Sequence, residues 1–251
     1  MSSAPPTIFS RQQAAAKWGR ARDRQRLHNG ATYLSDTIAQ DILDRLDFMR
    51  FEPSRALVVG DSTQVIPDAL RAKGIEGSIG QLGELDEEQP GPIGAFDLVV
   101  HLLGLGHVND LPGALIHGRN ALTEGGLFIA AFPGAGSLPV LRQLALAADG
   151  DRPAARIHPM VDNRAATGLL ERAGFKRQVV DTFPIRVRFP SLQRMIGDLR
   201  DHGLTRSLVS PVPPLTRTMW ARAEELFETL REDKDGKVVE TFEILVLTGW
   251  K

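Results

Sequence analysis

Cysteine is absent from the 251-residue chain, and its absence excludes several kinds of structure and site. Without thiols the chain holds no disulfide framework, no thiolate-bound zinc, no iron–sulfur cluster and no cysteine nucleophile. It also lacks an apolar run of the ~20 residues that a membrane-spanning helix needs. Its first residues contain prolines and lack the apolar core of a secretory signal. We therefore expect a cytoplasmic protein without a transmembrane segment.

Neither sign of charge dominates the composition. The chain has 30 Lys and Arg against 31 Asp and Glu, which gives a formal net charge of −1. Such a balance provides no overall field to attract a phosphate polymer, so nucleic acid is not an expected partner. The hydrophobic share of 42% and the length are sufficient for a full core in one or two domains.

The first fifty residues are expected to be helical and to precede the main domain. We divide the chain into a disordered tail at residues 1–6, an N-terminal helical segment at residues 7–53, and an α/β domain at residues 54–251 with a helical insertion at about 190–235. The helical segment opens with six basic residues, Arg11, Lys17, Arg20, Arg22, Arg24 and Arg26. This basic segment fits either a solvated helix face or a contact surface for an acidic partner.

From residue 54 onward, short apolar strands alternate with helical patterns. Residues 56–60 and 96–101 are largely continuous apolar runs, which are typical of strands buried on both faces of a parallel sheet. Further strands are predicted at 127–132, 176–182 and 238–250, and helices at 66–73, 111–122 and 167–173. This order predicts an α/β fold with a Rossmann-like, doubly wound, mostly parallel sheet and an antiparallel C-terminal edge strand.

In such a sheet, ligands bind beyond the carboxyl ends of the strands. The first of these ends reads Gly60-Asp61-Ser62-Thr63. It contains only one glycine of the G-x-G-x-x-G dinucleotide motif and lacks the Gly-Lys-Ser/Thr ending of a phosphate loop, so neither motif is complete. Asp61 and Ser62 also fit an ordinary turn or the N-terminal cap of a helix.

The second strand end carries two histidines, His101 and His107, followed by Asn109 and Asp110. At this edge of the sheet they could form an acid–base site, or they could line a pocket without taking part in chemistry. A metal site is not expected, because no second carboxylate stands at a recognisable ligand spacing. Asn109 and Asp110 fit helix caps ahead of Pro112.

A series of short segments spread over nearly the whole chain carries a family resemblance. These segments are Phe96-Asp97-Leu98-Val99-Val100, Val108-Asn109-Asp110-Leu111-Pro112, Gly125-Gly126-Leu127-Phe128-Ile129, Gly134-Ala135-Gly136-Ser137-Leu138, His158-Pro159-Met160-Val161-Asp162, Ala173-Gly174-Phe175 and Val180-Asp181-Thr182. Together they resemble the class I methyltransferases that depend on S-adenosylmethionine. Within that superfamily they are most similar to the methyltransferase-like assembly factors of respiratory complex I, with the biotin-pathway carrier-protein methyltransferases as cousins.

The resemblance implies S-adenosylmethionine as the cofactor and identifies no catalytic residue. The cofactor-binding positions that it implies are Gly60, Asp61, Ser62, Thr63, Gln81, Leu82, His101 and Leu102. It further implies a protein substrate or an assembly partner, and the complex I branch is associated with arginine hydroxylation of a respiratory subunit.

Three features depart from the family pattern. Ser62 and Gln64 occupy places where the family has glycines, and Gln81 stands where it has an acidic residue at the end of the second strand. A complete set of crossovers also barely fits in the stretch from Ala56 to Val100, since one strand–helix–strand unit takes roughly 30 residues or more. An element between Gly74 and Pro90 should therefore be shortened or missing.

Two hypotheses of function follow. The first is a methyltransferase that acts on a protein or carrier-bound substrate, because methyl transfer from an activated sulfonium requires alignment more than acid–base side chains. The alternative is a catalytically inactive binding or assembly protein with the same fold. Asp201 and His202, beside the place where the complex I branch has an acidic residue, are interpreted as surface residues at a helix end.

Overall fold

The computed structural model describes residues 7–232 and 235–251, so the tail that we expect to be disordered lies outside the described residues. The helices are α1 (Arg11–His28), α2 (Tyr33–Met49), α3 (Val65–Ala72), α4 (Leu111–Ala121), α5 (Pro139–Asp149), α6 (Asn163–Arg172), α7 (Leu192–Asp201) and α8 (Arg217–Thr229), with a short 3₁₀ helix η1 (Gly104–His107). The strands are β1 (Arg55–Val59), β2 (Glu76–Gly80), β3 (Phe96–Leu102), β4 (Leu122–Pro133), β5 (Lys176–Phe189) and β6 (Val238–Trp250).

These strands form one mixed sheet in the order β2-β1-β3-β4-β6-β5. The first four strands in this order run parallel, and β6 is antiparallel to both of its neighbours. The C-terminal strand is antiparallel, as predicted, but it lies between β4 and β5, so β5 forms that edge of the sheet. An inner position fits its sequence, because residues 244–249 are buried without a break.

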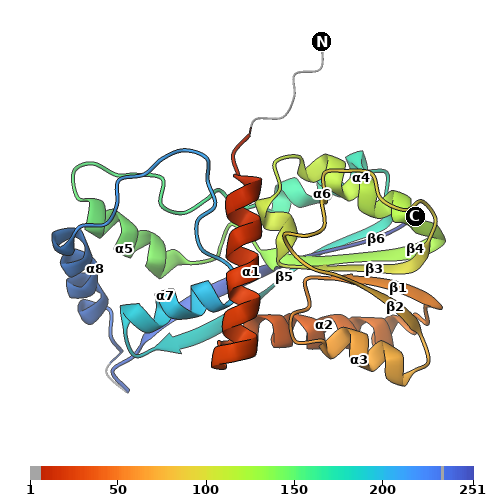
Figure 1. Cartoon of the computed structure of the whole chain (residues 1–251), viewed down its shortest axis with the longest axis horizontal. Helices are drawn as coiled ribbons and strands as arrows, with labels where there is room; N and C mark the ends of the chain where they lie inside the picture. The colour runs from red at the N-terminus through yellow and green to blue at the C-terminus, as the bar shows by residue number, and fades with distance from the viewer. Residues whose placement is uncertain (1–6, 233–234) are drawn as a thin grey trace, which may run out of the picture.

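Helices cover both faces of the sheet (Figure 1). Side chains such as Val58, Val100 and Ile129 point into a core shared with α2 and α3. Their neighbours Val99 and Phe128 point into a second core with α4 and α6. Because successive residues of a strand face opposite sides, a run buried on both faces must be apolar throughout. The predicted doubly wound α/β fold is therefore confirmed.

The segment between β2 and β3 contains neither a helix nor a strand. Residues 81–95 connect the two strands as a loop, although β2 and β3 lie on opposite sides of β1. One crossover unit is thus missing from the described chain, in agreement with the shortening inferred between Gly74 and Pro90. As a result, β2 is the edge strand on this side.

Helices α5, α7 and α8 form a group of their own at one end of the molecule, with α1 running between this group and the first strands of the sheet (Figure 1). Helices α7 and α8 share one continuous core with the sheet. Four residues of α5 also belong to this core, namely Val140, Leu141, Leu144 and Ala148. Five of the helices begin at a residue whose side-chain oxygen accepts a backbone N–H bond, namely Ser10 for α1, Asp110 for α4, Asp162 for α6, Ser191 for α7 and Thr216 for α8.

Candidate functional site

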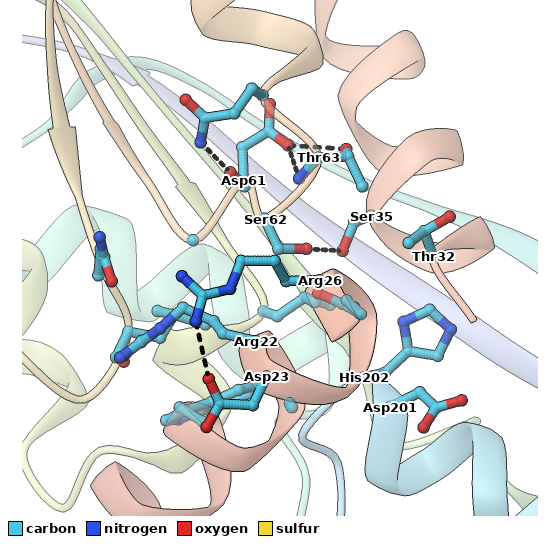
Figure 2. Close-up of a pocket in the computed structure, with 18 of the residues that line it drawn as sticks. Arg22, Asp23, Arg26, Thr32, Ser35, Asp61, Ser62, Thr63, Asp201 and His202 are labelled. Atoms are coloured by element: carbon cyan, nitrogen blue, oxygen red, sulfur yellow. Dashed lines mark hydrogen bonds and ion pairs between the residues drawn. The ribbon is translucent and has the colours of Figure 1, made fainter. Parts of the chain in front are cut away.

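A cavity of about 570 Å³ lies at the carboxyl ends of β1 and β2. It is lined by residues of α1, the start of α2, the loop after β1, the end of β2, Leu103 after β3, and the end of α7 (Figure 2). This is where the strand order reverses, because β2 and β3 lie on either side of β1. Ligands of doubly wound sheets bind at such a reversal, and small-molecule sites typically measure ~300–1,000 Å³. Position and size therefore both fit a ligand site.

The backbone of this cavity adopts conformations that side chains rarely tolerate. Gly60 has φ of 84°, and a Cβ atom there would lie 2.3 Å from the carbonyl oxygen of Leu102. Gln64 and Leu103 also line the cavity and have φ of 62° and 64°, although both carry side chains. Left-handed conformations of this kind cost about 1–2 kcal/mol each and concentrate at functional sites.

The carboxylate of Asp61 is already committed to holding the turn. It accepts hydrogen bonds from the backbone N–H of Thr63 at 3.1 Å and of Ile66 at 2.8 Å, and it is buried. This is the turn and helix-cap role that the sequence also allowed. Ser62, in contrast, is exposed, and its hydroxyl has only a long 3.4 Å contact with the Ser35 hydroxyl.

The structure brings together six of the eight residues that the resemblance implied. Gly60, Asp61, Ser62, Thr63, Gln81 and Leu82 all line the cavity. His101 and Leu102 lie on β3, buried and outside its lining. The Nε2 atom of His101 is 3.2 Å from the Glu87 carboxylate, which belongs to the 81–95 loop, so this ring helps to hold the loop in place. Whether any of the eight residues touches a cofactor stays a prediction.

Helix α1 forms one wall of the cavity and is tied down at several points. Arg22 donates from Nη1 to the carbonyl oxygen of Leu82 at 2.6 Å, which joins α1 to the loop after β2. Arg24 pairs with the buried carboxylate of Asp201, which also accepts the backbone N–H of Ala31 at 2.9 Å. The basic residues with partners within the chain are Arg11, Lys17, Arg22 and Arg24, and Arg26 forms a looser pair with Asp23. Most of the basic segment is therefore engaged in intramolecular contacts.

Lys17 is buried on the side of α1 that faces away from solvent. Its Nζ donates to the carbonyl oxygen of Thr205 at 3.2 Å and to the hydroxyl of Ser207 at 3.3 Å. Burial lowers the pKa of Lys17 to about 7. The rings of His107 and His158 lie nearby with their centroids 4.3 Å apart, and burial lowers the pKa of both. His107 is thus part of the core and lines neither this cavity nor the second one described below.

His202 lines the cavity and is only 2% exposed. Neither of its ring nitrogens has a hydrogen-bond partner in residues 7–232 or 235–251. The ring packs edge-on against Tyr33, with centroids 4.6 Å apart, and burial lowers the pKa of His202 to about 4. The interpretation of Asp201 and His202 as surface residues is wrong, because α1 and α2 pack over this end of α7. His202 is therefore a neutral imidazole in the cavity wall, and both of its nitrogens are closed off from solvent.

The polar groups of the cavity come from opposite sides. Figure 2 shows the Arg26 guanidinium between the Ser62 loop and Asp23, with His202 and Asp201 on the far side. Arg26 is 3.7 Å from Asp23, and both side chains are largely exposed, so this pair constrains the guanidinium little. Sequence reasoning missed His202 and the α1 residues, because nothing in their local pattern indicates which part of the fold they cover.

Asp110 and Asn109 turn out to have different roles. Asp110 caps α4, as expected, and accepts the backbone N–H of Gly113 at 3.0 Å. Asn109 does not cap the helix, because its side-chain oxygen accepts the backbone N–H groups of Ile8 and Phe9 at 2.7 and 2.8 Å. It thereby anchors the segment that leads into α1.

Two kinds of feature are absent from residues 7–232 and 235–251. No cluster of three or more His, Asp or Glu side chains in that part is arranged to hold a metal ion. No helix in it combines the length and hydropathy that crossing a membrane requires.

Comparison with known sequences places the chain near two kinds of protein, and no family model matches it. It is 28% identical over 226 residues to the mitochondrial arginine hydroxylase NDUFAF5 of Danio rerio, covering 88% of this chain and 66% of that protein. With NDUFAF5 of Homo sapiens it shares 34% over 159 residues, which are 62% and 46% of the two chains. The malonyl-[acyl-carrier protein] O-methyltransferase of Laribacter hongkongensis is 25% identical over 256 residues, which are 89% and 84% of the two chains.

The chain spans about half to two thirds of the length of these arginine hydroxylases. They are named as mitochondrial proteins, so the location of this chain stays a prediction.

Solved structures show the same fold. The [4+2]-cyclase SpnF superimposes with a TM-score of 0.50 at 13% identity, covering 100% of this chain and 99% of that one. A Bacillus halodurans protein assigned as a methyltransferase also gives 0.50, at 14% identity, over 83% of this chain and 98% of that one. SpnF, a cyclase, shows that this fold also occurs in proteins with other activities. The sheet order and these superpositions agree: the chain has the fold of the class I S-adenosylmethionine-dependent methyltransferases, and its sequence is similar to the arginine hydroxylases and the carrier-protein methyltransferases named above.

Proposed function

We propose that the cavity at the ends of β1 and β2 binds S-adenosylmethionine and that the protein transfers a group to an acceptor presented by a protein or a carrier. The single observation that supports this most is the 570 Å³ cavity itself, which lies beside the Gly60 turn at the reversal point of a methyltransferase-type sheet. When bound, the cofactor supplies a methyl group already activated on a sulfonium.

The lining residues fit the parts of such a cofactor. The exposed amide of Gln81, at the end of β2, can exchange hydrogen bonds with ribose hydroxyls as a neutral partner. The loosely held Arg26 guanidinium suits a carboxylate, and the Ser62 hydroxyl and the Asp23 carboxylate can accept bonds from an ammonium. Leu82, buried and adjacent to Gly60, offers an apolar surface to a flat ring.

His202 is the group best placed to handle a proton in the same cavity. Because burial keeps its pKa near 4, the ring is neutral at neutral pH and one nitrogen carries a free lone pair. Both nitrogens are closed off from solvent, so a ring nitrogen would accept the proton that a nucleophilic acceptor loses on methylation once binding of the acceptor uncovers it. The remaining walls exclude water and align the reacting groups, which is the main contribution that methyl transfer requires of a protein.

The names of the relatives indicate the class of acceptor. One group is named for arginine and the other for a malonyl group on an acyl carrier protein. The second name describes a small reacting group that is delivered on a carrier protein. We therefore propose a protein-bound or carrier-bound acceptor for this chain, without a preference between the two.

Isothermal titration with S-adenosylmethionine and S-adenosylhomocysteine tests cofactor binding. We expect a Kd in the micromolar range for the full chain. Gln81→Leu should weaken binding about fivefold, because it removes one hydrogen-bonding partner worth about 1 kcal/mol. Gln89→Leu is the matched control, since Gln89 is exposed in the same loop but does not line the cavity.

Arg26→Gln should also weaken binding of S-adenosylmethionine, and Arg20→Gln, on the exposed face of α1, should not.

The absence of any heat or thermal shift with either ligand at millimolar concentration would refute the proposal. That result would favour the alternative, a binding or assembly protein that no longer takes the cofactor. The loop at 81–95, which replaces a crossover unit, and the glutamine at position 81 are the observations that favour this alternative.

A further inference from the structure

A second cavity, of about 230 Å³, lies among α5, α7, α8 and the loop that follows α7. The end of α7 separates the two cavities, because Asp201 and His202 line the first and Leu199 and Leu204 line the second. Neither the proposed cofactor nor the Gly60 turn has a part in this second cavity. The residues that line the second cavity therefore determine which ligand it can bind.

Most of the cavity wall is aliphatic. The apolar lining residues are Leu138, Leu141, Leu144, Ala145, Ala148, Ile157, Leu192, Ile196, Leu199, Leu204, Val212, Leu215, Trp220 and Ala223. No aspartate or glutamate is among the described residues that line it. Leu215, in the loop before α8, is 47% exposed, so the cavity opens to solvent there. An apolar chain could enter past this loop and replace water along the wall.

The polar lining residues lie in two adjoining segments, 156–158 and 205–206, and they are cationic or neutral. The guanidinium of Arg156 is neutralised by the buried carboxylate of Asp149, at 2.6 Å. Arg206 has no such partner within residues 7–232 and 235–251: its Nε donates to the carbonyl oxygen of Ala155 at 3.4 Å, and its Nη2 is buried without a hydrogen bond. Leaving a charged N–H group without a hydrogen-bond partner costs free energy, and a guanidinium cannot avoid that cost by releasing its proton.

The histidine at the same end of the cavity adds no charge to it. His158 lines it and is buried, and its pKa is lowered to about 4 by burial and by the charges of Lys17 and Arg142. The imidazole is therefore neutral and adds no charge at neutral pH. Arg206 is half-buried, and a guanidinium held partly out of water without a counter-ion forms a strong charge-assisted hydrogen bond when it meets an anion.

We propose that this second cavity binds a single unbranched apolar chain that ends in a carboxylate, with the carboxylate at Arg206 and the chain along the leucine-lined wall. The apolar wall determines the tail, and the unpaired guanidinium determines the sign of the head group. The proposal does not depend on cofactor binding, because no residue of the Gly60 turn takes part.

Titration calorimetry of the full chain with decanoate and with decan-1-ol tests the head group. Both probes carry the same tail, so we expect decanoate to bind at least fivefold more tightly than the alcohol. Arg206→Gln should weaken decanoate binding about tenfold and leave decan-1-ol within about twofold. Unchanged alcohol binding in this variant also shows that the cavity has kept its shape. Arg152→Gln, an exposed arginine outside the lining, is the control and should leave both affinities unchanged.

Filling the cavity tests the tail. Ala145→Phe, on the wall formed by α5, should abolish binding of both probes, whereas Ala147→Phe, on the same helix but outside the lining, should not. Equal affinities for decanoate and decan-1-ol in the unmodified protein would overturn the anionic head group. Binding that survives Ala145→Phe, or an absence of decanoate binding to the unmodified protein, would overturn the site itself.

Discussion

Gly60→Ala is expected to lower the free energy of unfolding by about 3 kcal/mol. Gly60 has φ of 84°, and a Cβ atom added there would lie 2.3 Å from the carbonyl oxygen of Leu102 and 3.1 Å from Cγ of Leu82. The first of these neighbours is backbone of the adjacent strand β3 and cannot rotate away. The substitution therefore combines backbone strain with separation of two paired strands.

Urea unfolding of Gly60→Ala and Gly74→Ala separates the two effects. Gly74 has a similar φ of 75°, but nothing lies within 4 Å of the position where its Cβ would be. Gly74→Ala should therefore cost only the strain of a left-handed alanine, about 1 kcal/mol. Equal losses in the two variants would show that the contact with β3 relaxes freely.

The contact between position 60 and strand β3 determines which substitution can test cofactor binding. A larger side chain at Gly60, such as in Gly60→Val, would disturb the β1–β3 pairing whether or not the cofactor binds. Loss of binding in that variant would therefore not distinguish a ligand contact from a folding defect. Gln81 is exposed at the end of β2, and its side chain can be replaced without moving the sheet.

The second large effect concerns pH. Between about pH 7 and pH 10 we expect the contribution of Lys17 to raise the free energy of unfolding by roughly 4 kcal/mol. Burial lowers the pKa of Lys17 from 10.5 to about 7 in the folded protein. In this range the unfolded chain holds the proton and the folded chain has released it, so raising the pH favours the folded state. Below about pH 7 both states are protonated, and the contribution stays at its lowest.

Lys17→Met should remove this slope. We would measure urea unfolding at several pH values for the unmodified protein, for Lys17→Met and for the exposed-lysine control Lys73→Met. The methionine variant should be the more stable one near neutral pH and lose this advantage as the pH rises. Parallel pH profiles for the unmodified protein and Lys17→Met would contradict the burial of a lysine whose pKa is lowered.

Much of the fold was predictable because its strands and turns are local features. The apolar runs at 56–60 and 96–101 became β1 and β3, and the strand predicted at 127–132 lies within β4. Even the missing crossover could be inferred, because a strand–helix–strand unit needs a minimum length of chain. Strand ends were less predictable: β5 continues to Phe189, well beyond the predicted end at residue 182, since pairing with β6 continues that far.

The candidate site was predictable only in part. The turn after β1 and the residues after β2 were found, because topology alone places them at one edge of the sheet. His101 lies on the strand that was expected to contribute to the site, yet it is buried beside Glu87. His202 was assigned to the surface, because its environment depends on helices α1 and α2, far away in sequence.

The amino-acid sequence by itself determined the α/β alternation, the parallel central strands and the turn at Gly60, because hydrophobic period and chain length act over short stretches. Only the tertiary structure decided what α1 covers, which histidines are left without partners, and that Arg206 meets an apolar cavity. These properties depend on contacts between residues distant along the chain, and burial in such contacts changes the pKa and hydrogen bonding of a side chain without any local signal.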